Sequence, residues 1–231
     1  MISKEEIKQI AIIKKKEEAS LIIRLMMASN DITTANHAAS TFKDGELKPT
    51  QEHIRQGYRM YFIRIQTGHL NEAMKLIKEL SDMLKTSKSL SATYEKCLPE
   101  NKKNFLKLQE CLPLGKTYNE FKQNVTKLRH KIVFHYNEKK LFKNAISNRI
   151  KDKKRKYSSI TISDDIRFGR FNIADEIIDT VVCSDLWNLH DDSTLRNEAD
   201  KHAQFGFELC VSFINFCKEF IFLYIKEHGE R

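Results

Sequence analysis

The sequence predicts an all-α protein, a bundle of amphipathic helices. Charged residues make up 31% of the chain, with only 7 Gly and 3 Pro in 231 residues, whereas turn-rich β folds use more of both. Apolar residues recur at steps of three and four over long stretches, which is the helical period. Hydrophobic residues reach 41% and include 14 Phe, so a sizeable core is expected within one domain.

The first third of the chain is expected to hold three helices. Apolar steps predict one over about 4–29 and a short second one over 32–41. A loop with Gly45 and Pro49 follows, and then a long helix over 51–84. Its expected buried side comprises Tyr58, Tyr61, Phe62, Ile65, Ala73, Leu76, Ile77 and Leu80.

The middle of the chain starts with a Ser/Thr/Lys-rich piece, 86–93, that is typical of a linker. A helix over 101–112 ends before Pro113, which cannot continue it. The next helix, over 116–136, has its apolar positions at helical steps. They are Tyr118, Phe121, Val125, Leu128 and Ile132. The helical pattern continues over 137–156 but becomes very basic.

The last third opens on two β-prone residues, Ile160 and Ile162, before a helix expected over 163–186. A last helix, capped by Ser193, is expected to reach about His228. Its apolar part contains Glu208, Asn215, Lys218 and Glu219, which would be costly in lipid. We therefore expect a buried central helix and no membrane span.

Charge and cysteine usage suggest where the protein works. The formal charge of +9 favours polyanionic partners such as nucleic acid. Five cysteines without a CxxC pair are typical of free thiols in a reducing cytosol, and the charged N-terminus does not resemble a secretory signal. A cytoplasmic location is expected.

The most informative segment is Arg129-His130-Lys131-Ile132-Val133-Phe134-His135. Cutting RNA without a metal needs proton transfer to and from oxygen, and positive charge at the phosphorane. Arg129 suits the phosphate and His135 suits the proton transfer, because an imidazole titrates near neutral pH. Six residues of α-helix separate the two by about 9 Å of rise and about 120° of rotation. One helix alone therefore makes a loose site, which a second copy of the motif in a dimer would complete.

Two other Arg–His pairs share this spacing pattern, Arg64–His69 and Arg196–His202. Arg64 is followed by an apolar residue, and acidic residues surround Arg196 and would repel a phosphate. Only Arg129 combines a polar successor, no intervening acid and a basic extension. The alternative for His135 is a helix-terminal residue that favours the helix dipole.

The basic extension holds nine Lys or Arg between residues 139 and 156. With Lys131, the side chains of Lys139, Lys140 and Lys143 are candidates for holding an RNA backbone. A solvated helix face is the alternative. The run His190-Asp191-Asp192 lacks further ligands at metal spacing, so we expect no metal site. The sequence has no P-loop and no Gly-rich nucleotide fingerprint, so no cofactor is expected.

The segment 129–135 resembles the signature of the HEPN superfamily of small helical bundles: Arg, a polar residue, several more residues, then His. Catalytic members of that family are metal-independent endoribonucleases of toxin–antitoxin and phage-defence systems, with the active site at a dimer interface. The resemblance implies a HEPN-like core over about 51–150, with C-terminal helices at 163–228 packing on it in one domain, 1–231. It also implies a homodimer in which Arg129 and His135 are catalytic, with His130 as a secondary polar group.

Three functions remain open from the sequence. The first is a toxin- or defence-type endoribonuclease acting on RNA, with an antitoxin or regulatory protein as a further partner. The second is a non-catalytic helical module that binds RNA or protein through the same basic surface. The third is a structural dimerisation bundle built on the Phe-rich last helix.

Overall fold

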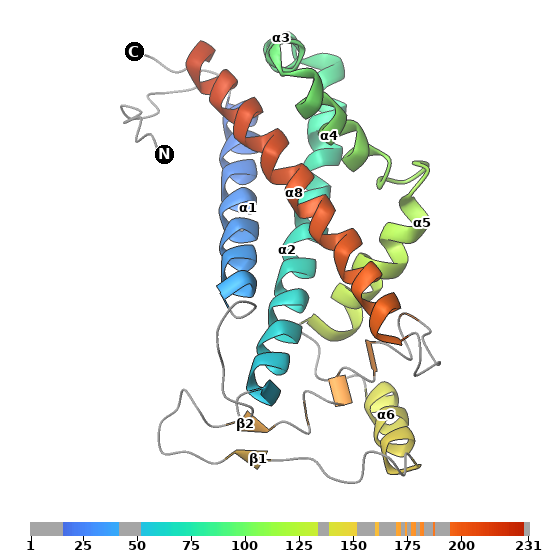
Figure 1. The fold of residues 1–231 in the computed structure, drawn as a ribbon. Helices are drawn as coiled ribbons and strands as arrows, with labels where there is room; N and C mark the ends of the chain where they lie inside the picture. The colour runs from blue at the N-terminus through green and yellow to red at the C-terminus, as the bar shows by residue number, and fades with distance from the viewer. Residues whose placement is uncertain are drawn as a thin grey trace.

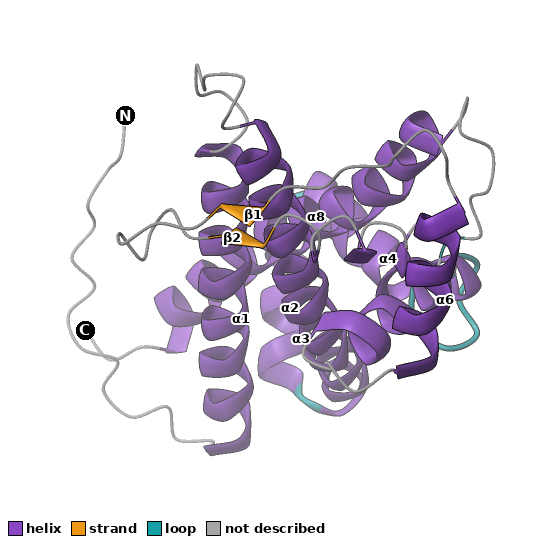
Figure 2. Ribbon diagram, turned by 90° about the horizontal axis from the view of Figure 1, so that it is seen from below, coloured by secondary structure: helices purple, strands orange, loops and turns teal. Residues whose placement is uncertain are grey.

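The protein is an all-α helical bundle, as the composition and periodicity predicted. The computed structural model describes residues 16–41, 52–133, 139–151, 160–161, 170–171, 174, 177–178, 181–182, 187 and 195–228. Helix dominates this part of the chain, and the orange pair β1–β2 is the exception (Figure 2). The elements are α1 (Lys16–Thr41), α2 (Glu52–Thr86), α3 (Lys88–Lys96), α4 (Pro99–Gln109), α5 (Tyr118–Phe121), the π-helical segments η2 (Lys122–Thr126) and η3 (Arg129–Val133), α6 (Lys139–Lys151), β1 (Ile160–Thr161), β2 (Arg170–Phe171) and α8 (Leu195–His228).

The long helices α1, α2 and α8 set the architecture. Helices α1 and α2 lie side by side and α8 crosses them, with its other flank against α4 (Figure 1). Helices α1 and α2 run antiparallel, since Arg24 pairs with Glu79 near one end and Asp31 approaches His69 nearer the other. The segment α5–η2–η3 runs back along α2, which places η3 beside the middle of that helix.

The main core lies where these helices meet. It is built from apolar side chains of α1 to α4, of α5 and η2, and of α8. Aromatic rings of three helices meet inside it: Phe105 stacks on Phe216 with centroids 4.5 Å apart, and Tyr94 lies 5.3 Å from Phe105. Such offset aromatic contacts add to the gain from burying their area. Helices α1 and α8 thus contribute to the same core as residues 52–133.

Helix α8 is also tied to α3 and α4 by three carboxylates. Glu208 pairs with Lys107 at 2.9 Å, and Glu227 pairs with Lys96 at 2.5 Å. Glu219 accepts hydrogen bonds from the backbone N–H of Leu98 at 3.1 Å and from Asn101 Nδ2 at 2.7 Å. Leu98 is the N-cap of α4 and has no side-chain cap of its own. A carboxylate there satisfies a free backbone donor and complements the helix dipole.

A second, smaller apolar cluster lies beside η3. It joins Leu128 to Phe142 and Ala145 of α6 and to five residues between 177 and 187. Those residues are Ile177, Ile178, Val181, Val182 and Trp187. The segment that carries Arg129 is therefore held on one side by the second cluster and on the other by α2.

Several expected boundaries prove wrong. Helix α1 passes without a break through 29–32, where two helices were expected; residues 4–15 lie outside the described residues. The expected linker 86–93 is largely helix α3, which begins after Ser87, whose hydroxyl caps the N–H of Leu90 at 3.2 Å. A serine favours this position because its side chain accepts from the first turn.

Further differences concern single elements. The helix expected over 116–136 is partly π-helical, in η2 and η3. Within the helix expected over 163–186, Arg170 and Phe171 form strand β2, paired antiparallel with β1. Tyr61 was placed on the buried side of α2, but it is 45% exposed. The other boundaries of α2 and α8 agree with the expectation to within two residues.

The structure also bears on the expectations of free cysteines and of no membrane span. Cys97, Cys111, Cys210 and Cys217 are free and buried, while Cys183 lies outside the described residues. Burial raises the pKa of Cys97 to about 11, with Glu219 adding to the effect. Among the helices of the described ranges, none has the length and apolar content that crossing a membrane requires.

Candidate functional site

Arg129 begins η3, at the point where that segment faces α2. A π-helical turn closes through a hydrogen bond between residues five apart, as from the N–H of Lys127 to the carbonyl of Lys122. Such turns occur mostly as short interruptions of an α-helix and are frequent at functional sites. Here they change the direction of the side chains of 122–131 relative to a regular α-helix. The β-branched Val125, Thr126, Ile132 and Val133 fit the α-helix less well than Leu or Ala.

The side chain of Arg129 is ion-paired rather than open. Its Nη2 lies 3.5 Å from Oε1 of Glu72 on α2, and 27% of its side-chain surface is exposed. The sequence pattern showed no acid within 129–135, but the fold supplies one from 57 residues away. The guanidinium is therefore held at the surface of the bundle by an acidic partner.

Glu72 is the centre of a small polar cluster. Its Oε2 accepts from Lys75 Nζ at 2.5 Å, and its Oε1 is 3.5 Å from Asn71 Nδ2 as well as from Arg129. The hydrogen bond from Lys75 is the main reason that the pKa of Glu72 is lowered, with the charge of Arg129 contributing, while partial burial opposes both. One carboxylate thus faces two cations and an amide.

The other predicted site residues differ in exposure, and some lie outside the described residues. His135 lies outside the described residues. His130, the next residue after Arg129, is exposed, and Lys131 is half-buried. On α6, Lys140 and Lys143 are exposed.

Lys139 is the first residue of α6, and its side chain lies outside the described residues. Helix α6 is connected to the Arg129 segment through the second apolar cluster, which contains Leu128 and Ala145. The described members of the predicted RNA-binding set therefore lie on η3 (Lys131) and on α6 (Lys140 and Lys143). The second apolar cluster lies beside η3 and includes residues of α6.

The two alternative Arg–His pairs are engaged elsewhere. His69 Nδ1 lies 3.6 Å from Asp31 of α1, and Arg64 is placed over the ring of Tyr61 at 5.9 Å. The ring of His202 stacks on Trp187 with centroids 5.0 Å apart. The side chain of Arg196 is outside the described residues. The described contacts of His69 and His202 are therefore with groups other than the arginine of their own pair.

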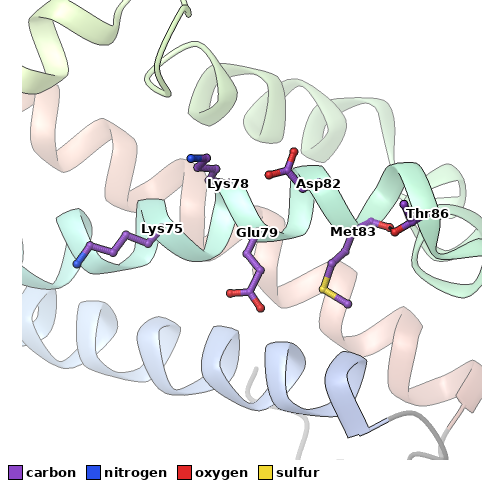
Figure 3. A pocket seen from close by; sticks show the side chains of 6 residues that line it. All are labelled: Lys75, Lys78, Glu79, Asp82, Met83 and Thr86. Carbon is purple, nitrogen blue, oxygen red and sulfur yellow. Dashed lines mark hydrogen bonds between the residues drawn. The ribbon is translucent and has the colours of Figure 1, made fainter.

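A shallow groove runs along the outer face of α2, next to the Glu72 cluster. Its volume is about 520 Å³, and its lining is Lys75, Lys78, Glu79, Asp82, Met83 and Thr86. Figure 3 shows Glu79 and Met83 pointing towards α1, while Lys78 and Asp82 extend to the opposite side of α2. Glu79 is bound by Arg24 through both of its oxygens, at 2.5 and 2.8 Å, which lowers the pKa of that carboxyl.

Sequence reasoning missed Glu72, Lys75 and Asn71. They lie on α2, and no local pattern links them to residue 129; only the packing of η3 on α2 does. In the ranges that the structure describes, no group of three or more His, Cys, Asp or Glu is placed to hold a metal ion. His190, Asp191 and Asp192 are outside these ranges.

Comparisons with protein-family models, with curated proteins and with solved structures found no match.

Proposed function

We propose that the protein is a metal-independent endoribonuclease of the HEPN type. In this proposal Arg129 binds and polarises the scissile phosphate, and His135 transfers the protons of the 2′-hydroxyl and the leaving oxygen. His130 is a further polar group at the site. Lys131, Lys139, Lys140 and Lys143 hold the RNA backbone, and the formal charge of +9 supports a polyanionic substrate.

The observation that carries the proposal is the setting of Arg129. Its guanidinium is partly exposed, is held at a fixed place on the bundle by a carboxylate, and is followed by the exposed His130. An arginine positioned to bind a carboxylate is also suited to bind a phosphate, because the oxygens of both anions can accept from the same pair of guanidinium N–H donors.

Two copies of the chain complete the site in this proposal. On a regular α-helix Arg129 and His135 would be separated by about 9 Å of rise, too far for a compact site, so in this proposal the second histidine and arginine come from a homodimer partner. In a toxin or defence system, an antitoxin or regulatory protein would control the active dimer. The cytoplasm, where the RNA substrates are, is the proposed location.

The test is cleavage of RNA by the purified protein in EDTA. We expect products with 2′,3′-cyclic phosphate ends. We also expect a loss of at least about 100-fold in rate for His135→Ala and Arg129→Ala, the size of effect that acid–base and charge-stabilising groups supply. Arg24→Ala is the matched control, because Arg24 is also half-exposed and paired with a glutamate of α2. His69→Ala tests the alternative Arg–His pair.

A non-catalytic RNA-binding module is the second candidate function. It is favoured by the ion pair of Arg129 with Glu72, because a guanidinium used only for binding or structure has no need of a nearby proton carrier. RNA binding by the dimer with no cleavage would favour this module over the nuclease, and cleavage that survives both His135→Ala and Arg129→Ala would exclude these residues as its source.

A further inference from the structure

Three donors of two different elements converge on the carboxylate of Glu72. Arg129 Nη2 of η3 and Asn71 Nδ2 of α2 each lie 3.5 Å from Oε1, and Lys75 Nζ lies 2.5 Å from Oε2. Two cations and an amide around two oxygens form an arrangement that binds an anion. In the described structure the anion is a side chain of the protein itself.

The members of this cluster differ in their access to solvent. Asn71 is 8% exposed and so belongs to the wall of the bundle, whereas the side chains of Lys75 and Glu72 are 66% and 49% exposed. Arg129 is intermediate at 27%. The carboxylate can therefore swing into water while Asn71 stays in place and Arg129 keeps most of its packing.

We propose that Arg129, Lys75 and Asn71 form a subsite for one phosphodiester group of RNA, and that Glu72 occupies this subsite when RNA is absent. The inference rests on the proposed function only in taking Arg129 as an RNA contact. When a phosphate enters, it replaces the Glu72 carboxylate and takes over its partners: the guanidinium of Arg129, the ammonium of Lys75 and the amide of Asn71.

The Arg24–Glu79 pair of the same helix shows the contrast. Glu79 lies two turns from Glu72, but a single arginine binds both of its oxygens, at 2.5 and 2.8 Å. This is a closed bidentate pair, in which the carboxylate and the guanidinium satisfy one another. Glu72 is instead shared by donors that do not depend on one another. Glu79 is therefore the natural control for Glu72.

The subsite lies at the end of the groove on α2, to which Lys75 contributes a wall (Figure 3). Lys78 lines the same groove but extends to the other side of α2. An RNA strand that leaves Arg129 along α2 meets Lys75 first. Lys75 therefore belongs to the subsite and Lys78 does not.

The experiment measures the binding of a fluorescein-labelled single-stranded RNA whose 2′-hydroxyls are methylated, so that it cannot be cut. We expect Glu72→Gln to tighten binding about two- to fivefold, the range that release of a partly exposed ion pair allows. Glu79→Gln removes the same charge from the same helix and should leave affinity within the error of the assay. Circular dichroism of both variants checks that they fold.

Two further variants locate the effect. Lys75→Ala should weaken binding and lower the slope of log affinity against log salt by about 0.7, as expected for the loss of one phosphate contact on a single strand. Lys78→Ala should change neither. In an Arg129→Ala background the gain from Glu72→Gln should vanish, because the two residues act on the same phosphate.

The inference is overturned by equal gains in Glu72→Gln and Glu79→Gln, which would reflect net charge alone. It is also overturned by a gain that persists without Arg129, or by no gain at all. These outcomes are separate from those for the nuclease: the methylated RNA reports on binding only. If cleavage were unaffected in Arg129→Ala and His135→Ala, the nuclease proposal would be wrong. The binding measurements would still support or refute the phosphate subsite.

Discussion

Two carboxylates of this bundle, Glu18 and Glu72, are each contacted by several polar side chains, yet their surroundings are opposite. Glu18 of α1 is 5% exposed. It accepts from the hydroxyls of Ser87 at 2.8 Å, Ser89 at 2.7 Å and Tyr224 at 2.9 Å. Glu72 is half-exposed; it accepts hydrogen bonds from Lys75 and Asn71 and forms an ion pair with Arg129.

This difference in exposure separates a structural cluster, around Glu18, from a cluster around Glu72 in which another anion can replace the carboxylate. The hydroxyls around Glu18 come from the start of α3 and from α8, so this buried residue joins three helices. Removing it leaves the hydroxyl of the buried Tyr224 without this acceptor and takes one hydrogen bond from each of two half-buried serines, which is costly. Around Glu72, solvent reaches the carboxylate and competes for the ammonium of Lys75, and a phosphate can do the same.

The largest expected effect follows from removing the buried carboxylate. We expect Glu18→Ala to lower the free energy of unfolding by about 3 kcal/mol or more, since several hydrogen bonds to a charged group are lost together. Chemical denaturation measures it. Glu17→Ala is the control, because Glu17 is the exposed neighbour in the same first turn of α1. Similar losses in the two variants would refute the structural role of Glu18.

A smaller effect is expected at the tyrosine that donates to Glu18. Tyr224→Phe removes one hydroxyl and should cost about 1.5 kcal/mol, the lower end for a hydrogen bond to a charged group. Tyr118→Phe, at the start of α5, is the matched substitution and should cost less. A Tyr224→Phe variant as stable as the native protein would show that the serines suffice to hold Glu18.

The same tyrosine predicts a pH dependence. Burial is the main reason that the pKa of Tyr224 is raised above its ordinary value of 10.0, and the hydrogen bond to Glu18 adds to it. The folded protein keeps this proton where the unfolded chain has lost it, so the stabilisation is complete below pH 10 and declines as the pH rises further. Denaturation at increasing alkaline pH should show a shallower decline for Tyr224→Phe.

The smallest effect on stability is expected at the exchangeable cluster. Glu72→Ala should change the free energy of unfolding by less than about 1 kcal/mol, as is usual for ion pairs open to solvent. The same denaturation series measures it beside Glu18→Ala. A loss equal to that of Glu18→Ala would make Glu72 a structural residue and remove the contrast between the two clusters.

The sequence predicts the long helices of this protein well and its short ones poorly. Helices α2 and α8 run for 35 and 34 residues, and their apolar period repeats often enough to be unmistakable. Helix α3 has nine residues, and a composition rich in Ser and Lys hides it. Its formation depends on the Ser87 cap and on the burial of Leu90 and Thr93, which are contacts within the folded bundle.

The same limit applies to the break expected in α1. Asn30 and Asp31 have low helix propensity, which suggests an interruption at this point. In the fold they continue a helix that is packed against α2: Asp31 approaches His69, and Asn36 accepts a hydrogen bond from Gln66. Tertiary packing therefore outweighs the local preference.

At the candidate site, sequence reasoning identified Arg129 but not its partner. The pattern around residue 129 suggests phosphate chemistry from residue types alone. The acid opposite Arg129 comes from a helix 57 residues earlier in the chain, so only the packing of η3 on α2 could reveal it. A motif specifies which side chains are present, whereas the fold decides which of them are already engaged.

The cap that Glu219 places on α4 bears on when, relative to its synthesis, the protein can fold. The first backbone donor of α4 belongs to Leu98, and its acceptor stands 121 residues later. While the chain emerges from the ribosome, the first backbone N–H of α4 therefore lacks its carboxylate acceptor until Glu219 has been made. The rings of Phe105 and Tyr94 likewise lack their contact with Phe216. Contacts so distant in sequence favour slow folding that is completed only after synthesis of α8.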